Sequence, residues 1–315
     1  MKVTTRRVLP AILCLFGLAC DGGAAVQDAD ATPDAVADAT GDATPDAVPD
    51  LVPAGPPALT SALTVIQVMR FVAEDPPGVS SGLDLDGLVT KAGDASGCGQ
   101  PDLQSPDGRP GVDNAFAFVL PPLEATMSST VNETAQEAID TGEVLLLLAV
   151  DGIDDPVDDD QVTVSLYRAE GRPKLGTDGR VLAGQSFYIA EGEPWSRDET
   201  ATIEGGVISA GPFPIVLSLD FFDTHIDLLM DNARVEYRLD ADGRATGVLG
   251  AMSHEDTLYK MVTDLDADFL PIAEVLLPEY ADIDMDGDGR CDALSIGVEL
   301  TGASAHLYQD AVVPE

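Results

Sequence analysis

Apolar and polar residues alternate along much of the chain after residue 60, with the two-residue period of a β-strand. Residues 161–169 and 294–301 follow this period, so each should bury one face and expose the other. Residues 61–72 (SALTVIQVMRFV) also predict a β-strand, which opens the domain. Residues 143–150 (EVLLLLAV) are an almost unbroken apolar run, which favours a buried strand.

Short strands of the same kind recur between residues 179 and 252, separated by Gly, Pro and Asp. Residues 240–243 (DADG) predict a hairpin turn. Such spacing is typical of a β-sandwich or a jelly roll. The strands predicted in this region are 181–190, 201–209, 213–221, 233–239 and 245–252.

A helical period is found in few places. Residues 128–140 begin with Ser and Thr, which can cap a helix, and end before Gly142, which can stop it. Residues 254–265 and 270–277 predict two more helices. We therefore expect a mainly β (α+β) fold with two or three helices, in a single globular domain over residues 58–315. The residues that share one face of the first helix are Val131, Ala135, Ala138 and Ile139.

The start of the chain has the pattern of an export signal. Residues 1–19 combine Lys2, Arg6 and Arg7 with an apolar run that is too short to anchor a protein across a bilayer. The following Gly-Leu-Ala-Cys20 resembles the lipobox of bacterial lipoproteins, in which the Cys is lipidated and begins the mature chain. Gly17 stands where that motif usually has Leu. Thr-Arg-Arg-Val-Leu also resembles a twin-arginine signal, which is the minority interpretation.

Residues 20–57 predict a disordered tether. Asp is the only charged residue type from 21 to 57, and Ala-Thr-Pro-Asp-Ala-Val occurs there twice. Such a segment buries too little apolar surface to offset its chain entropy, and Pro and like charges keep it extended. We expect a spacer between membrane and domain, with a glycosylated stalk as the alternative. The domain would then be extracytoplasmic in a bacterial cell envelope, with the outer membrane favoured.

The charge balance narrows the range of partners. The chain has 16 Lys and Arg against 56 Asp and Glu, which gives a net charge of −40. Such a surface repels nucleic acids and anionic lipid headgroups. We therefore expect no nucleic-acid partner.

The most specific motif is at residues 282–295 (DIDMDGDGRCDALS). Counted from Asp284, acidic side chains fall at positions one, three, five and nine of a calcium loop, and Gly289 falls at the sharp turn at six. Ser295 replaces the Glu that an EF-hand has at twelve, and a strand rather than a helix is predicted to follow. The loop thus resembles those of dockerin and thrombospondin type 3 repeats. We expect structural Ca²⁺ here, against the alternative of a solvated acidic turn; the predicted ligands are Asp284, Asp286, Asp288, Asp292 and the carbonyl of Arg290.

Two other acidic stretches are candidates for binding. Residues 82–114 form a long segment rich in Gly, Pro and Asp, and long irregular loops are usually functional or stabilised by ions. It predicts either a second metal site or a donor of the carboxylate missing at position twelve; a plain acidic loop is the alternative. Residues 151–160 form a third acidic loop, at the tip of a predicted hairpin. The candidate ligands of the second site are Asp84, Asp86, Asp107 and Asp113.

The cysteines predict one disulfide. Of the 4 Cys residues, Cys14 leaves with the signal and Cys20 takes the lipid. Cys98 and Cys291 remain as an even pair in an oxidising compartment. Their disulfide would hold residues 82–114 beside the calcium loop.

Catalytic signals are weak. The chain has no Gly-x-Ser-x-Gly, His-Glu-x-x-His, P-loop or Gly-x-Gly-x-x-Gly motif. His225, His254 and His306 lack the spacing of zinc ligands. Trp195 could stack on a sugar if exposed, or fill the core if buried.

Several segments together resemble a family of uncharacterised myxobacterial-type envelope lipoproteins. They are Gly82-Leu-Asp-Leu-Asp-Gly87, the loop around Cys98, residues 106–114, residues 151–155 and the terminal calcium loop. The resemblance implies an envelope location and no established activity. We expect a lipid-anchored, calcium-stabilised protein with a binding or structural role and a possible cell-surface or carbohydrate partner. The alternatives are a carbohydrate-binding module and a calcium-dependent hydrolase.

Overall fold

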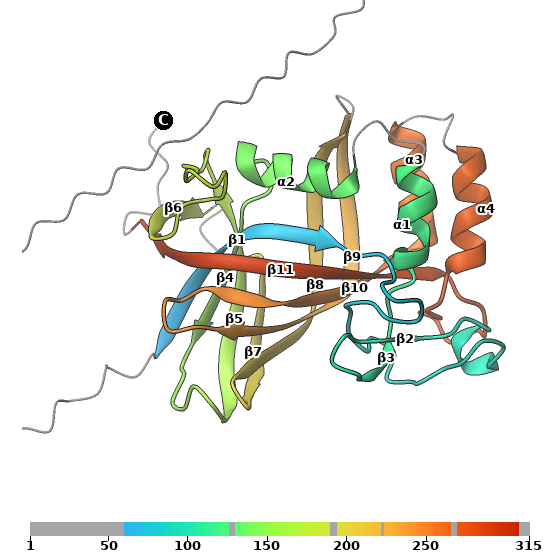
Figure 1. Cartoon of the computed structure of the whole chain (residues 1–315), viewed down its shortest axis with the longest axis horizontal. Helices are drawn as coiled ribbons and strands as arrows, with labels where there is room; N and C mark the ends of the chain where they lie inside the picture. The colour runs from blue at the N-terminus through green and yellow to red at the C-terminus, as the bar shows by residue number, and fades with distance from the viewer. Residues whose placement is uncertain (1–59, 126–129, 190–193, 222–223, 266–269, 309–315) are drawn as a thin grey trace, which may run out of the picture. The chain divides into compact units, whose positions relative to one another are not determined.

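A β-sheet that closes on itself forms the centre of the protein, as Figure 1 shows. The computed structural model describes residues 60–125, 130–189, 194–221, 224–265 and 270–308, all within one unit, Gly55–Glu315. Eight of the described strands pair antiparallel in a ring, since the first also pairs with the last. In order around the ring they are β1 (Ser61–Phe71), β4 (Leu146–Asp151), β5 (Asp159–Glu170), β7 (Ser196–Glu204), β8 (Val207–Phe221), β9 (Thr224–Leu239), β10 (Ala245–His254) and β11 (Ala293–Leu307). A shorter strand, β6 (Gln185–Ile189), pairs with both β5 and β11.

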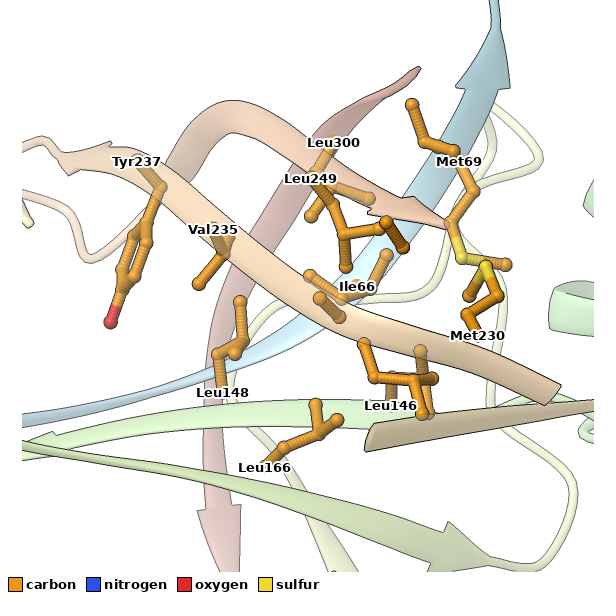
Figure 2. Packing of buried hydrophobic residues seen from close by; sticks show 14 of the residues in the cluster. Ile66, Met69, Leu146, Leu148, Leu166, Met230, Val235, Tyr237, Leu249 and Leu300 are labelled. Atoms are coloured by element: carbon orange, nitrogen blue, oxygen red, sulfur yellow. The ribbon is translucent and has the colours of Figure 1, made fainter. Parts of the chain in front are cut away.

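The interior of the barrel is filled by apolar side chains. Figure 2 shows Ile66, Leu148 and Leu300 directed toward one another from three different strands. They leave a cavity of only about 20 Å³, which is lined entirely by apolar residues. Tyr237 also points inward, and its hydroxyl is the one buried side-chain polar atom of the described residues without a hydrogen-bond partner. The barrel is thus a packed core rather than a ligand chamber.

Four helices are described outside the ring: α1 (Phe116–Glu124), α2 (Val131–Thr141), α3 (Glu255–Leu265) and α4 (Leu270–Tyr280). In α2, the hydroxyl of Thr130 accepts from the Glu133 N–H at 3.1 Å, and the Glu133 carboxylate accepts in return from the Thr130 N–H at 2.9 Å. Helix α2 contacts β1, whereas α4 contacts both α1 and α3. None of the described helices is long and apolar enough to cross a membrane.

The mainly β class is confirmed, and the pairings give it the form of a closed barrel, not specifically of a sandwich or jelly roll. The predicted strand at 201–209 is wrong, because Gly205 and Gly206 both have positive φ angles and form the turn between β7 and β8. Helix α1 was not predicted, since Pro121 and Pro122 lie inside it and make the segment look like a loop. The helix predicted from residue 128 begins at Val131, and residues 126–129 lie outside the described parts.

Residues 82–114 are largely irregular, as expected. They contain the 3₁₀ turn η1 (Ala95–Gly97) and the two short paired strands β2 (Leu103–Gln104) and β3 (Pro110–Val112). The side chain of Asn114 fastens the end of this segment to the barrel, because its oxygen accepts from the Gly297 N–H of β11 at 2.8 Å. Its amide also donates to Ser81 O at 2.9 Å.

Candidate metal centre

The first acidic cluster lies in the loop between α4 and β11. Oxygen atoms of Asp284, Asp286 and Asp288 all lie within 4.8 Å of one another. Calcium binds oxygen at about 2.3–2.6 Å, so oxygens on opposite sides of one ion are separated by roughly twice that distance. The three carboxylates therefore fit the coordination shell of a single Ca²⁺.

Backbone amides hold this loop in shape. The Asp284 carboxylate accepts from the N–H groups of Gly287 at 2.8 Å, Asp288 at 3.2 Å and Gly289 at 2.8 Å. These bonds, first that from Gly289, lower the pKa of the Asp284 carboxyl. Gly289 has a φ of 88°, as the sharp turn at position six requires. The loop thus keeps its position-one carboxylate ionised, which is the form that binds a cation.

The predicted ligand at position nine is turned elsewhere. Asp292 accepts from the Met285 N–H at 2.9 Å, and its other oxygen lies 3.5 Å from Nε2 of His254. Asp292 is not one of the three residues whose oxygens converge. It stabilises the loop instead by accepting the Met285 N–H. The backbone N–H of Arg290, at position seven, donates to Asp288 at 2.8 Å. Of the four predicted side-chain ligands, three are brought together.

Ser295, at position twelve, faces the protein interior. It is fully buried, its N–H donates to Asp282 at 2.9 Å, and its hydroxyl also donates to that carboxylate. The same hydroxyl accepts from the Ala115 N–H at 2.7 Å. Burial, partly offset by these bonds, raises the pKa of Asp282 to about 7. Ser295 therefore joins the loop to α1 and is unavailable to an ion.

The second acidic cluster lies in residues 82–114. Oxygens of Asp84, Asp86 and Asp113 lie within 4.8 Å of one another. Asp107, predicted with them, is outside this cluster; it accepts from the Ser105 hydroxyl and pairs with Arg109 at 3.3 Å. The structure thus brings together three of the four residues proposed for a second site.

Asp113 is the most unusual carboxyl group of this cluster. Its side chain is buried, and one oxygen accepts from the Leu85 N–H at 2.6 Å and the Asp86 N–H at 3.3 Å. Burial raises its pKa to about 8, and the nearby charges of Asp86, Asp282 and Asp102 add to the rise. The pKa of Asp86 is raised as well, chiefly by burial. A divalent cation would remove this repulsion, because it favours the ionised carboxylates.

The loops that carry the two acidic clusters are joined by a disulfide and by apolar contacts. The Cys98–Cys291 disulfide, with Cα atoms 5.8 Å apart, joins their loops, so the predicted pairing is confirmed. Leu83 and Leu85 of one loop also pack with Ile283 of the other, in a small apolar cluster separate from the barrel core. In the second loop the buried Leu83 and Leu85 thus alternate with Asp84 and Asp86 of the cluster, whereas in the first loop Ile283 is buried and Met285 is exposed. The alternation of leucine and aspartate at residues 83–86 is the sequence signal that could have predicted this packing.

The other candidate groups do not converge. In residues 151–160, Asp159 accepts from the Asp154 N–H at 2.7 Å and Asp155 from the Val157 N–H at 2.8 Å, as in ordinary acidic turns. His306 lies on β11, and the side chain of His225 lies outside the described ones. Trp195 is half-buried against the barrel core, which favours packing over sugar stacking.

Comparison with protein-family models, with curated proteins and with solved structures finds no match for this chain. The resemblance to envelope lipoproteins therefore stays a prediction.

Proposed function

We propose that this chain is a calcium-stabilised binding or structural protein of the bacterial cell envelope, attached to the membrane through a lipid on Cys20. The observation that carries the calcium part is the convergence of Asp284, Asp286 and Asp288 in a loop with glycine at its sharp turn. Oxygen-only donors of this kind suit Ca²⁺ rather than a softer metal.

The ion would act on stability. The acidic loops and the disulfide lie in segments that are 193 residues apart in sequence, so an ion there would help to fasten the two ends of the domain. Asp84, Asp86 and Asp113 would hold a second ion beside the first loop. Since Ca²⁺ is abundant outside the cytoplasm, such sites would stay filled, and a structural role is favoured over a regulated one.

The test is a calorimetric calcium titration of the full chain in detergent, with thermal melts in calcium and in chelator. We expect saturable binding and a lower melting temperature in chelator, and Asp286→Ala/Asp288→Ala should lose binding at the first loop. Asp154→Ala/Asp155→Ala, in the third acidic loop, is the matched control. Absence of binding heat together with an unchanged melt would reject the calcium sites.

The anchor is tested separately. Cys20→Ala should move the protein from the membrane fraction to the soluble fraction, and labelled palmitate should no longer be incorporated. Cys14→Ala is the control and should change neither. Retention of Cys20→Ala in the membrane fraction would contradict the lipid anchor.

A further inference from the structure

A polar groove is lined by residues of β7, β8 and β9 and of the segment 82–114, which Figure 1 shows beside the barrel. Its volume is about 540 Å³, within the roughly 300–1,000 Å³ of small-molecule sites. It is distinct from the apolar cavity inside the barrel, with which it shares only Val235.

Strand register builds the floor of this groove. Thr202 on β7 is paired with Ser209 on β8, and Ser209 is paired with Glu236 on β9. Directly paired residues project on the same side of a sheet. Their neighbours Ile203 and Ile208 are buried in the core. Two hydroxyls and a carboxylate therefore form one row across three strands on the outer face.

Two guanidinium groups lie above this row. Arg109 forms an ion pair with Glu236 at 2.8 Å. Arg234, two residues from Glu236 on β9, donates to the backbone oxygen of Asp84 at 3.1 Å. No described carboxylate lies within ion-pair distance of Arg234. Its remaining N–H groups are thus free to donate to a ligand.

The groove is closed to an added peptide strand. The pairing of β7 with β8 ends at Thr202 and Ser209. Beyond this pair, the Asp198 carboxylate accepts hydrogen bonds from backbone N–H groups that no partner strand satisfies. It accepts from the Gly211 N–H at 2.9 Å and from the Thr200 N–H at 2.8 Å, and Pro212 has no N–H. Because these donors are already used, an added strand would find no free backbone N–H at Thr200 or Gly211.

We propose that this groove is a binding site for a neutral oligosaccharide, which deepens the proposed binding function and rests on it. Paired donors and acceptors on Thr202, Ser209, Glu236 and Arg234 match the vicinal hydroxyls of a sugar ring. A chain of net charge −40 with Asp198 and Glu236 at the groove disfavours an anionic sugar. None of the described residues that line the groove is aromatic, so hydrogen bonds carry the specificity and binding is weak.

The test is saturation-transfer NMR on the full chain in detergent. The probes are the trisaccharides of the cello-, malto-, manno-, xylo- and chito- series, with trigalacturonate as the anionic comparison. We expect transfer to at least one neutral trisaccharide. Ser209→Val and Arg234→Leu should each weaken its binding about five- to tenfold, as the loss of one or two hydrogen bonds implies.

Thr246→Val is the matched control, since Thr246 is exposed on β10 and lies outside the groove lining. It should leave binding unchanged, and a thermal melt of each variant shows that it is folded. The proposal is overturned if no neutral trisaccharide binds, if only trigalacturonate binds, or if folded groove variants bind as well as the native chain.

The same samples separate this proposal from the calcium sites. A chelator-sensitive melt without sugar binding rejects the groove and leaves the metal centre intact. Sugar binding, together with no calcium binding heat and a melting temperature that chelator leaves unchanged, supports the groove and rejects the calcium sites.

Discussion

Asp113 should make the free energy of unfolding of this protein fall as pH rises, and bound calcium should offset most of that fall. Its carboxyl group is 3% exposed and its pKa is raised from the ordinary 3.8 to about 8 by burial and by the neighbouring carboxylates. Below pH 3.8 the group is protonated in both the folded and the unfolded chain. Between 3.8 and about 8 the folded chain keeps a proton that the unfolded chain has released, so the free energy of unfolding falls as pH rises.

The size of the effect follows from the shift. A rise of about four units, at ~1.4 kcal/mol per unit, amounts to ~6 kcal/mol lost across this window. That is comparable with the whole stability of an ordinary domain. A bound Ca²⁺ favours the ionised form and should restore most of the loss.

The assay is urea unfolding in chelator between pH 5.5 and 8.5. Asp113→Asn retains an oxygen to accept from the Leu85 N–H but has no charge. We expect it to be more stable than the native chain at pH 8.5 by several kcal/mol, with a smaller advantage at pH 5.5. In excess calcium the order should reverse, because the variant has lost a ligand.

Asp242→Asn, at an exposed hairpin turn, is the control for the general effect of removing a negative charge. If the native and Asp113→Asn stabilities run parallel from pH 5.5 to 8.5 in chelator, then burial of this carboxylate carries no penalty. The reasoning would then be refuted.

Three further predictions concern the elements that hold the site. Removal of the disulfide by Cys98→Ser/Cys291→Ser should cost ~5 kcal/mol at most, from the chain entropy of closing a loop of 193 residues; denaturant unfolding measures it, and an unchanged midpoint would contradict it. Asn114→Ala should cost ~3 kcal/mol in the same assay, because it leaves the buried Gly297 N–H without an acceptor, and an unchanged denaturation midpoint would refute this. Gly289→Ala should lower calcium affinity and cost ~1 kcal/mol, since a φ of 88° strains any residue with a Cβ; calorimetry that shows native affinity would exclude a role for this turn.

Much of the strand content could be predicted from local pattern. The two-residue period of β5 and the apolar run of β4 follow from which faces are buried. The capping box at Thr130 and the stop at Gly142 mark α2 equally well, because they depend on neighbouring residues only. Local pattern failed at α1, whose two prolines would normally break a helix, and at 201–209, where two adjacent glycines form a turn.

For the candidate site, the sequence by itself determined the donor types, the spacing of Asp284, Asp286 and Asp288, the glycine at the turn and the pairing of the two remaining cysteines. These depend on short-range geometry and on counting. Only the tertiary structure decided that Asp113 joins Asp84 and Asp86 whereas Asp107 does not, and that Asp292 faces His254. It also decided that the sheet closes, and that Thr202, Ser209 and Glu236 form one row. The physical reason is that burial, strand register and the distance between charges far apart in sequence are set by packing, which no local pattern records.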